Sequence, residues 1–214
     1  MLVKNRMSQP VITVEPDMPI MEALNLMKTK QIRRLPVVDG KGNLIGIVSN
    51  EDLLNASPSD VTSLSVWEIN YLIGKITVKK VMTKDVLTIN ENTPIEEAAR
   101  IMVDNKVGGL PVMSGNKLVG VITESDLFKV LLELMGAREN GVRATAIIPE
   151  KLGELEKLTH AIAEAGGSFI SFGQFNGDDD DNRIVTFKVS GMDEAAVETV
   201  VSPLVNKIID IRKV

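Results

Sequence analysis

Hydrophobic positions recur in the same order in two stretches of the chain. Each stretch begins with a short alternating apolar segment, Val11–Val14 or Val86–Ile89, which predicts a strand. Apolar residues then fall at i, i+3, i+4 and i+7 from Ile20 and again from Ile95, which predicts an amphipathic helix in each stretch. Two apolar segments around a polar turn follow, and then a second helix. The predicted order in each of the two stretches is strand, helix, hairpin, helix.

The turns between the paired apolar segments carry glycine and asparagine, which supply the positive φ that tight hairpins require. The second copy also has a helix-start signal, because Thr93 is placed as an N-cap, Pro94 as the first helical residue and Glu96 as the partner of a capping box. The predicted hairpin strands are Leu35–Val38 with Leu44–Ser49, and Leu110–Met113 with Leu118–Thr123.

The two copies share individual residues as well as a pattern. Two copies of a long repeat favour a duplicated unit that packs on itself over an open solenoid, which needs three or more repeats. A ligand site is therefore expected at the seam between the copies. The matched positions include Met7 with Met82, Pro19 with Pro94, Ala23 with Ala98, Met27 with Met102, and Leu35–Val37 with Leu110–Val112.

Between the copies, Leu64, Trp67, Tyr71 and Leu72 fit one face of a connecting helix. Packing or a dimer contact is the preferred interpretation of this face, ahead of base stacking. The predicted limits of the repeats are residues 1–60 and, with the connecting helix, 61–136.

The last third of the chain has a different pattern. Strand, helix, hairpin, helix and strand are predicted in a βαββαβ order, which gives an antiparallel sheet covered on one face by two helices in a ferredoxin-like arrangement. The predicted domain is residues 141–214, and its first helix has an apolar stripe. The predicted elements are the strand 143–148, the helix stripe of Leu152, Leu155, Leu158, Ile162 and Ala165, the hairpin 169–175 with 184–189, the helix 194–201 and the strand 208–211.

Composition narrows the possible chemistry. The chain of 214 residues has no cysteine and one histidine, His160, on the polar side of a predicted helix. Cysteine and Ser-His-Asp nucleophiles and typical zinc sites are thus excluded. The formal net charge of -5 disfavours broad nucleic-acid binding. Charges interrupt every apolar stretch before the length of a membrane helix, so a cytoplasmic protein without a membrane segment is expected.

Each copy places Ser/Thr-x-x-Asp at the start of its last helix, as Ser49–Asp52 and Thr123–Asp126. A carboxylate there can accept hydrogen bonds from a ribose diol, and the hydroxyl lies beside free backbone amides that suit a phosphate. The same pattern is also a capping arrangement that many helices use without a ligand. One residue can serve both purposes.

These motifs carry a family resemblance. Gly46–Asp52 and Gly120–Asp126, each preceded by Leu-Pro-Val, resemble the repeats of CBS domains, and the pair over residues 1–135 resembles a Bateman module. The resemblance implies binding of AMP, ADP, ATP, S-adenosylmethionine or a related adenosyl ligand across the seam, and it implies a homodimer. The implied residues at one site are Asp52, Ser49, Ile47, Arg33 and Arg34 with Thr93, Ala98, Val107 and Gly108. Those at the other are Asp126, Thr123, Val121, Gly108 and Gly109 with Met18, Ala23, Ile32 and Arg33.

The copies differ where Arg33–Arg34 of the first matches Gly108–Gly109 of the second. Guanidinium groups bind phosphates well, so the Asp52 site is expected to favour the more highly charged ligand. The alternative is that both arginines lie on a solvated edge.

The C-terminal pattern resembles an ACT domain, a family that commonly binds amino acids at a paired interface next to a Pro-Gly turn. Here the turn is Pro149–Gly153 with its glycine displaced, which places amino-acid binding in question. The acidic run Asp178–Asp181 lacks the spacing of a calcium loop and is interpreted as solvated.

Two sensor modules in one short chain resemble the small regulators of the acetoin-utilisation type. The first hypothesis is a non-catalytic adenine-nucleotide sensor, in which ligand binding shifts the relative angle of the repeats. The alternative is an amino-acid-responsive regulator that senses through an ACT dimer, with the CBS pair as scaffold. An enzyme is disfavoured because only carboxylate chemistry survives the composition.

Overall fold

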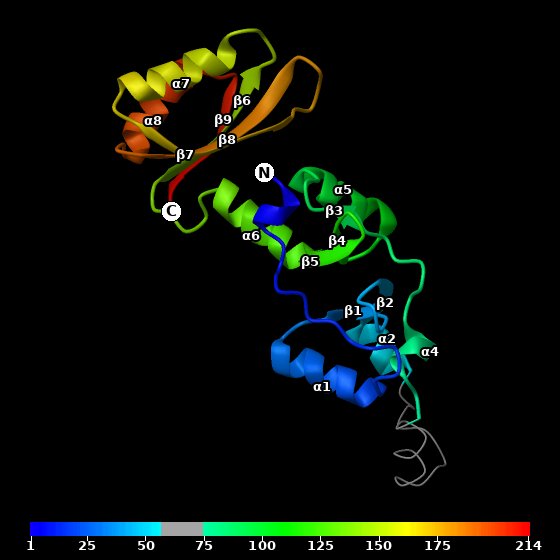
Figure 1. Cartoon of the computed structure of the whole chain (residues 1–214). Helices are drawn as coiled ribbons and strands as arrows, with labels where there is room; N and C mark the ends of the chain where they lie inside the picture. The colour runs from blue at the N-terminus through cyan, green and yellow to red at the C-terminus, as the bar shows by residue number, and fades with distance from the viewer. Residues whose placement is uncertain (57–74) are drawn as a thin grey trace. The chain divides into compact units, whose positions relative to one another are not determined.

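Each repeat contains a helix, a hairpin and a second helix, and the first of two units in the computed structural model contains both repeats up to the first turn of the last of these helices. The units are residues 1–127 and 128–214 (Figure 1). The structure describes residues 1–56 and 75–214, so the predicted connecting helix lies outside the described residues. Within the described ranges, no helix is long and apolar enough to cross a membrane.

The elements from the N-terminus to the helix that leaves the second repeat are η1 (Val3–Asn5), α1 (Ile20–Lys30), β1 (Arg34–Val38), β2 (Leu44–Ser49), α2 (Asn50–Asn55), α4 (Val78–Val81), β3 (Ile89–Asn90), α5 (Ile95–Asn105), β4 (Gly109–Ser114), β5 (Lys117–Thr123) and α6 (Glu124–Leu134). Strands β1 and β2 are antiparallel, as are β4 and β5, and β3 is parallel to β4.

The predicted helical stripes form the core of each repeat. In the first repeat, Ile20, Ala23 and Met27 of α1 pack against the hairpin. In the second, Ile95, Ala98 and Met102 of α5 are buried at the equivalent positions. Burial of a large apolar side chain contributes roughly 1.5–3 kcal/mol to folding. The buried positions of each helix are the apolar positions whose helical spacing was recognised in the sequence.

Two expectations about local structure were wrong. Within 11–14 only Val14 makes a bridge, to Val37, and within 86–89 only Ile89 belongs to a strand. The N-cap of α5 is Pro94 rather than Thr93, and no side chain caps this helix end. The Thr93 carbonyl instead accepts a hydrogen bond of 2.9 Å from the amide of Val3, so η1 lies against this turn.

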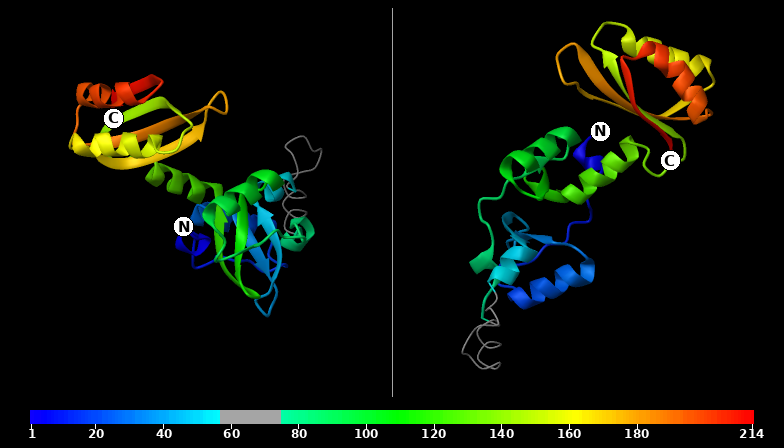
Figure 2. Two further views of the ribbon diagram at one scale, coloured as in Figure 1. Left: turned by 90° about the horizontal axis from the view of Figure 1, so that it is seen from above. Right: turned by 180° about the vertical axis from the view of Figure 1, so that it is seen from behind.

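The second unit has the predicted βαββαβ order. Its elements after α6 are β6 (Val142–Pro149), α7 (Glu154–Glu164), β7 (Ser168–Asn176), β8 (Asn182–Ser190), α8 (Glu194–Val201), η2 (Ser202–Leu204) and β9 (Lys207–Lys213). The sheet order is β7-β8-β6-β9 with every neighbouring pair antiparallel. Both α7 and α8 cover one face (Figure 1; Figure 2).

The core of this unit lies between that sheet face and the two helices, with Phe187 fully buried. Leu158 and Ile162 of the predicted α7 stripe are buried there, but the prediction was wrong for Leu152, Leu155 and Ala165, the last of which is exposed just after the helix end. Leu152 precedes the helix and is fully exposed, and Leu155 is 40% exposed. The helix starts after Gly153, whose φ of 88° lies in the left-handed region that glycine favours.

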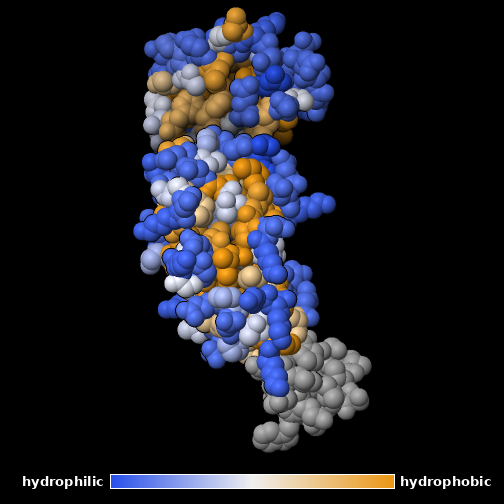
Figure 3. Space-filling model, turned by 45° about the vertical axis from the view of Figure 1, so that its right-hand side comes forward, coloured by the Kyte–Doolittle hydropathy of each residue, from blue (hydrophilic) through white to orange (hydrophobic). Residues whose placement is uncertain are grey.

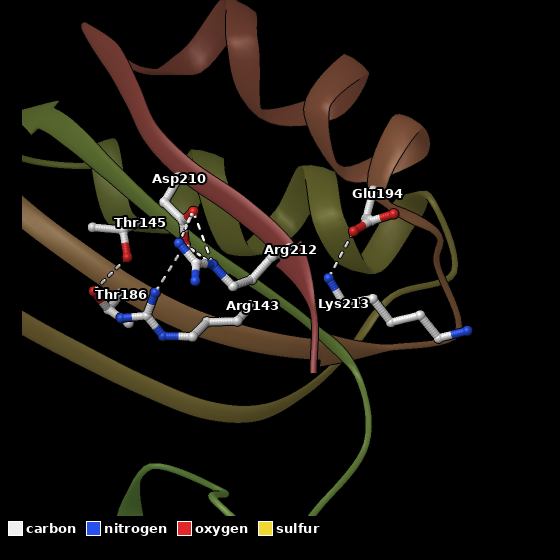
Figure 4. A network of polar contacts seen from close by, with 7 residues as sticks. All are labelled: Arg143, Thr145, Thr186, Glu194, Asp210, Arg212 and Lys213. Atoms are coloured by element: carbon white, nitrogen blue, oxygen red, sulfur yellow. Dashed lines mark hydrogen bonds and ion pairs between the residues drawn. The ribbon is translucent and has the colours of Figure 1, made fainter.

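The other sheet face is polar. Thr145 and Thr186 share a hydrogen bond of 3.0 Å, and Arg143 and Arg212 both contact Asp210 (Figure 4). Hydrogen bonds from Arg212, together with the charge of Arg143, hold the pKa of Asp210 below its usual value.

Candidate functional site

Both Ser/Thr-x-x-Asp turns close a hydrogen-bonded ring at a helix start. The Asp52 Oδ2 atom accepts from the Ser49 amide and hydroxyl, each at 2.7 Å, and the Asp52 amide donates to Ser49 Oγ at 3.1 Å. Asp126 Oδ2 likewise accepts from the Thr123 amide at 3.0 Å and hydroxyl at 2.8 Å. The Ser49–Asp52 turn is therefore a complete capping box at the start of α2, and in the Thr123–Asp126 turn the aspartate closes back on Thr123. A capping box leaves a ligand role open for Asp52, because its carboxylate has a second oxygen.

The two turns differ in their surroundings. Asp126 is only 6% exposed, whereas Asp52 is half-buried. Within the described parts of the chain, no partner is recorded for Asp52 Oδ1. This oxygen is the acceptor that a hydroxyl-bearing ligand could use.

A cavity of about 310 Å³ lies beside Asp52 and is called the Asp52 cavity below. The first repeat contributes four of its lining residues, including the first and last residues of the Ser49–Asp52 turn. The second repeat and the segment that leads into it contribute the rest, so the cavity spans the seam between the copies. The lining residues are Arg34, Ile47, Ser49, Asp52, Thr83, Asp85, Val86, Leu87, Lys106, Val107, Gly108, Gly109, Leu110 and Pro111.

The seam is held by exchanged backbone pairs. Thr83, which leads into the second repeat, exchanges two hydrogen bonds of 2.9 Å with Ile47 in β2. Ser8, which leads into the first repeat, pairs in the same way with Val121 in β5 at 2.8 and 3.2 Å. Each repeat thus contributes a leading segment to the edge of the other, and this exchange brings Thr83–Leu87 to the Asp52 cavity.

Arg34 crosses the seam. In the hairpin register it is directly opposite Ser49, so the two side chains share a face of the sheet. Its guanidinium lies against Gly108, where an added Cβ would stand 3.1 Å from Arg34 Cζ, and its Cδ would lie 3.3 Å from a Cβ on Gly109. The Gly108–Gly109 pair of the second repeat therefore leaves the space that the Arg34 side chain of the first repeat occupies.

The charged groups of the cavity are balanced in number. Arg34 and Lys106 are cationic, and Asp52 and Asp85 are anionic. Lys106 follows the last turn of α5 in a left-handed conformation with φ of 53°, and its equivalent in the first repeat, Gln31, has the same φ. The cavity combines these charges with apolar side chains such as Val86 and Leu110, as a site for a ligand with apolar and polar parts requires.

Three of the residues expected at the Asp52 site do not line this cavity. Arg33 is exposed and lines a different surface hollow with Ile32, between α1 and α2. Thr93 lies at the turn beside Val3, and Ala98 is fully buried in the α5 stripe. The expected residues that the structure does bring together are Asp52, Ser49, Ile47, Arg34, Val107 and Gly108.

The residues expected around Asp126 are more dispersed. Val121 is bound by Ser8 through the backbone, and Gly109 lies opposite Thr123 in the hairpin. Ala23 is fully buried, and Met18 packs on the core of the first repeat. Gly108 and Gly109, expected here, line the Asp52 cavity instead.

Sequence reasoning missed the leading segment and Lys106. Thr83, Asp85, Val86 and Leu87 were assigned to a strand or left unassigned, although they directly follow Met82, the first matched residue of the second copy. The signal for Lys106 was its place immediately before Val107 and Gly108, which the resemblance had already selected.

Metal binding has no support among the described residues, where no group of three acidic or histidine side chains is placed to hold an ion. In the Asp178–Asp181 loop, the Asp179 side chain accepts hydrogen bonds from the Asp181 amide at 3.1 Å and from Asn182 at 2.6 Å. The Asp179 carboxylate is therefore used within the loop itself.

Comparison with known proteins identifies the repeats. The CBS domain profile matches residues 3–59 and 78–133. Over 135 residues the chain is 35% identical to a CBS domain-containing protein of Dictyostelium discoideum, a match that spans 63% of this chain and 93% of that protein. It is also 35% identical over 159 residues to inosine-5'-monophosphate dehydrogenase of Methanocaldococcus jannaschii, where it spans only 29% of the enzyme.

Solved structures agree with this match. The CBS domain pair of protein MJ0100, in complex with 5'-methylthioadenosine and S-adenosyl-L-methionine, is 28% identical with a TM-score of 0.52, over 65% of this chain and 98% of that one. A putative acetoin utilisation protein, AcuB, from Vibrio cholerae is 30% identical with a TM-score of 0.53, over 64% and 95% of the two chains. CBSX2 in complex with AMP is 32% identical with a TM-score of 0.50, over 61% and 96%.

Proposed function

We propose that this chain, which belongs to the CBS domain family, is a non-catalytic regulatory protein that binds an adenosyl ligand between its two CBS repeats. The observation that carries the proposal is the Asp52 cavity, which is built from both repeats and contains the Oδ1 atom of Asp52. A vicinal ribose diol is the matching donor for such a carboxylate oxygen.

The surroundings of Asp52 support the same ligand class. Apolar side chains from both repeats offer a surface for a purine base, and Ser49 and Arg34 line the cavity together with Asp52 and can bind polar groups. The related CBS domain pair of MJ0100 is in complex with S-adenosyl-L-methionine and 5'-methylthioadenosine, and CBSX2 is in complex with AMP. A ligand that contacts both repeats would shift their relative arrangement if it prefers one arrangement.

The second unit is proposed to be an ACT-like regulatory domain because its βαββαβ order and antiparallel sheet match that expectation. Self-association as a homodimer is also proposed. Its support is a set of large apolar side chains that are exposed on α6, namely Phe128, Leu131, Leu132 and Leu134. Apolar residues also reach the surface of the first unit among hydrophilic ones (Figure 3).

Calorimetric titration of the full chain with adenosyl ligands tests the nucleotide proposal. Asp52→Ala should weaken every adenosyl ligand by about tenfold or more, because a charge-assisted hydrogen bond is lost. Glu51→Ala is the matched control, since Glu51 is exposed in the same helical turn and does not line the cavity.

Two outcomes would contradict this proposal. Equal affinities of the Asp52→Ala variant and the wild type would remove Asp52 from the site. Binding of an amino acid, with no response to any adenosyl ligand, would favour the alternative in which the C-terminal unit is the sensor and the Ser/Thr-x-x-Asp turns are helix caps.

A further inference from the structure

Arg34 has the position of a ligand-binding cation. It lines the Asp52 cavity, lies directly opposite Ser49 and is half-buried at the seam. Within residues 1–56 and 75–214 its guanidinium forms no hydrogen bond or ion pair. A partly desolvated guanidinium without a protein partner is available to bind an anion in a bidentate manner.

Lys106 provides a second cation from the other repeat. It lines the same cavity, and its side chain also has no hydrogen-bonding partner among the described residues. Lys106 is the C-cap of α5 and has a left-handed backbone conformation. It immediately precedes Val107 and Gly108, which also line the cavity. Cations from both sides of the seam therefore converge on one cavity.

The carboxylates near these cations oppose an anionic ligand less directly. Asp52 Oδ2 accepts two hydrogen bonds from Ser49, and under the proposed function Asp52 meets a ribose that every adenosyl ligand carries. Asp85 and Glu124 are exposed, as Lys106 is, so solvent and salt screen all three of these charges, and Arg34 is the less exposed of the two cations. The Glu124 carboxylate lies at 2.8 Å from the point where a Cβ on Gly108 would stand, beside the Arg34 guanidinium.

We infer that the Asp52 cavity selects adenosyl ligands that carry a phosphate, which Arg34 of the first repeat and Lys106 of the second bind together. The inference rests on the proposed function and narrows its ligand class. The expected order of affinity is ADP first, uncharged 5'-methylthioadenosine second and cationic S-adenosylmethionine last. The two cations, Arg34 and Lys106, attract the phosphates of ADP and repel the sulfonium of S-adenosylmethionine.

Calorimetry on the full chain with ADP, 5'-methylthioadenosine and S-adenosylmethionine tests this order. In wild type, ADP should bind about tenfold more tightly than 5'-methylthioadenosine. Arg34→Gln and Lys106→Gln should each weaken ADP binding by about tenfold and leave the affinity for 5'-methylthioadenosine unchanged. Arg34→Lys should restore part of the ADP affinity, because it keeps the charge without the bidentate geometry.

Arg33→Gln is the matched control, because it removes the same charge from the neighbouring residue, which lies outside the cavity. It should leave the affinity for all three ligands unchanged. Added salt should weaken ADP binding and spare 5'-methylthioadenosine, as expected for a charge contribution.

The outcomes separate this inference from the proposed function. If 5'-methylthioadenosine binds through Asp52 as tightly as ADP, the proposed function stands and charge selection is wrong. If Arg34→Gln weakens both ligands equally, Arg34 supports the fold of the seam and does not select phosphate. If none of the three ligands binds, the proposed function itself fails, and the inference fails with it.

Discussion

At the scale of single residues, the aspartate of each Ser/Thr-x-x-Asp turn accepts two hydrogen bonds from the residue three positions before it, but the two aspartates differ in burial. Asp126 is 6% exposed and accepts two hydrogen bonds from Thr123, whereas Asp52 is half-buried. Replacing a buried acceptor costs more than replacing a solvated one. Asp126→Asn should lower the free energy of unfolding of the first unit by about 1–2 kcal/mol, and Asp52→Asn by less, in urea denaturation followed by circular dichroism. A larger loss for Asp52→Asn would contradict this account.

Single residues also show why only part of the Asp52 site could be predicted from the sequence. The motif residues Ser49 and Asp52 could be selected because their role follows from local sequence. Arg33 and Arg34 could not be separated, although adjacent residues entering a strand point to opposite faces. The separation depends on where β1 begins, and Arg34 is its first residue, opposite Ser49. Strand ends are set by tertiary pairing and are therefore the least certain part of a sequence interpretation.

At the scale of elements, the predictions of the long helices and of the hairpins were confirmed, and the predictions of a leading strand in each repeat were wrong. An amphipathic helix and a hairpin each form from local pattern and turn residues. A strand needs a partner, and Val14 finds only a short parallel bridge to Val37. The segments that begin with Ser8 and Thr83 pair instead with the opposite repeat. Their apolar residues fill the core and the cavity, so their alternation resembled that of a strand.

A substitution at Gly46 tests the contact between β2 and the segment that leads into the second repeat. Gly46 lies in β2 opposite Val37, and an added Cβ would stand 2.5 Å from Met82 Sδ and 3.1 Å from the Thr83 carbonyl oxygen. Gly46→Ala should therefore destabilise the first unit by about 1–3 kcal/mol in thermal denaturation, through overpacking against the leading segment.

Gly40 provides the control for this substitution. A Cβ on Gly40 would meet nothing within 4 Å, so Gly40→Ala should change the melting temperature little. Combining Gly46→Ala with Met82→Ala should cost less than the sum of the two single changes, because the clash is shared. Strict additivity would show that Gly46 does not serve the contact with Met82.

At the scale of the whole molecule, the sequence predicted the repeats and the βαββαβ order because every such element has its own apolar period. It did not predict how the chain is fixed between α6 and β6. A lysine in an alternating strand is ordinarily solvated, yet Lys188 in β8 is only 5% exposed. Its Nζ donates to the carbonyls of Gly136 and Glu139, a contact between residues far apart in the sequence that no local pattern encodes.

Lys188 should therefore hold the segment that joins α6 to the C-terminal sheet. Its Nζ hydrogen bonds are 2.8 Å to Gly136 and 3.0 Å to Glu139. Lys188→Met keeps the apolar stem but removes both bonds, which should cost the second unit about 1–3 kcal/mol. Hydrogen exchange should then accelerate in residues 136–141. Lys207→Met, at an exposed site in β9, should leave exchange there unchanged. Unchanged exchange in Lys188→Met would show that backbone packing alone fixes this segment, and that the buried ammonium group is dispensable for it.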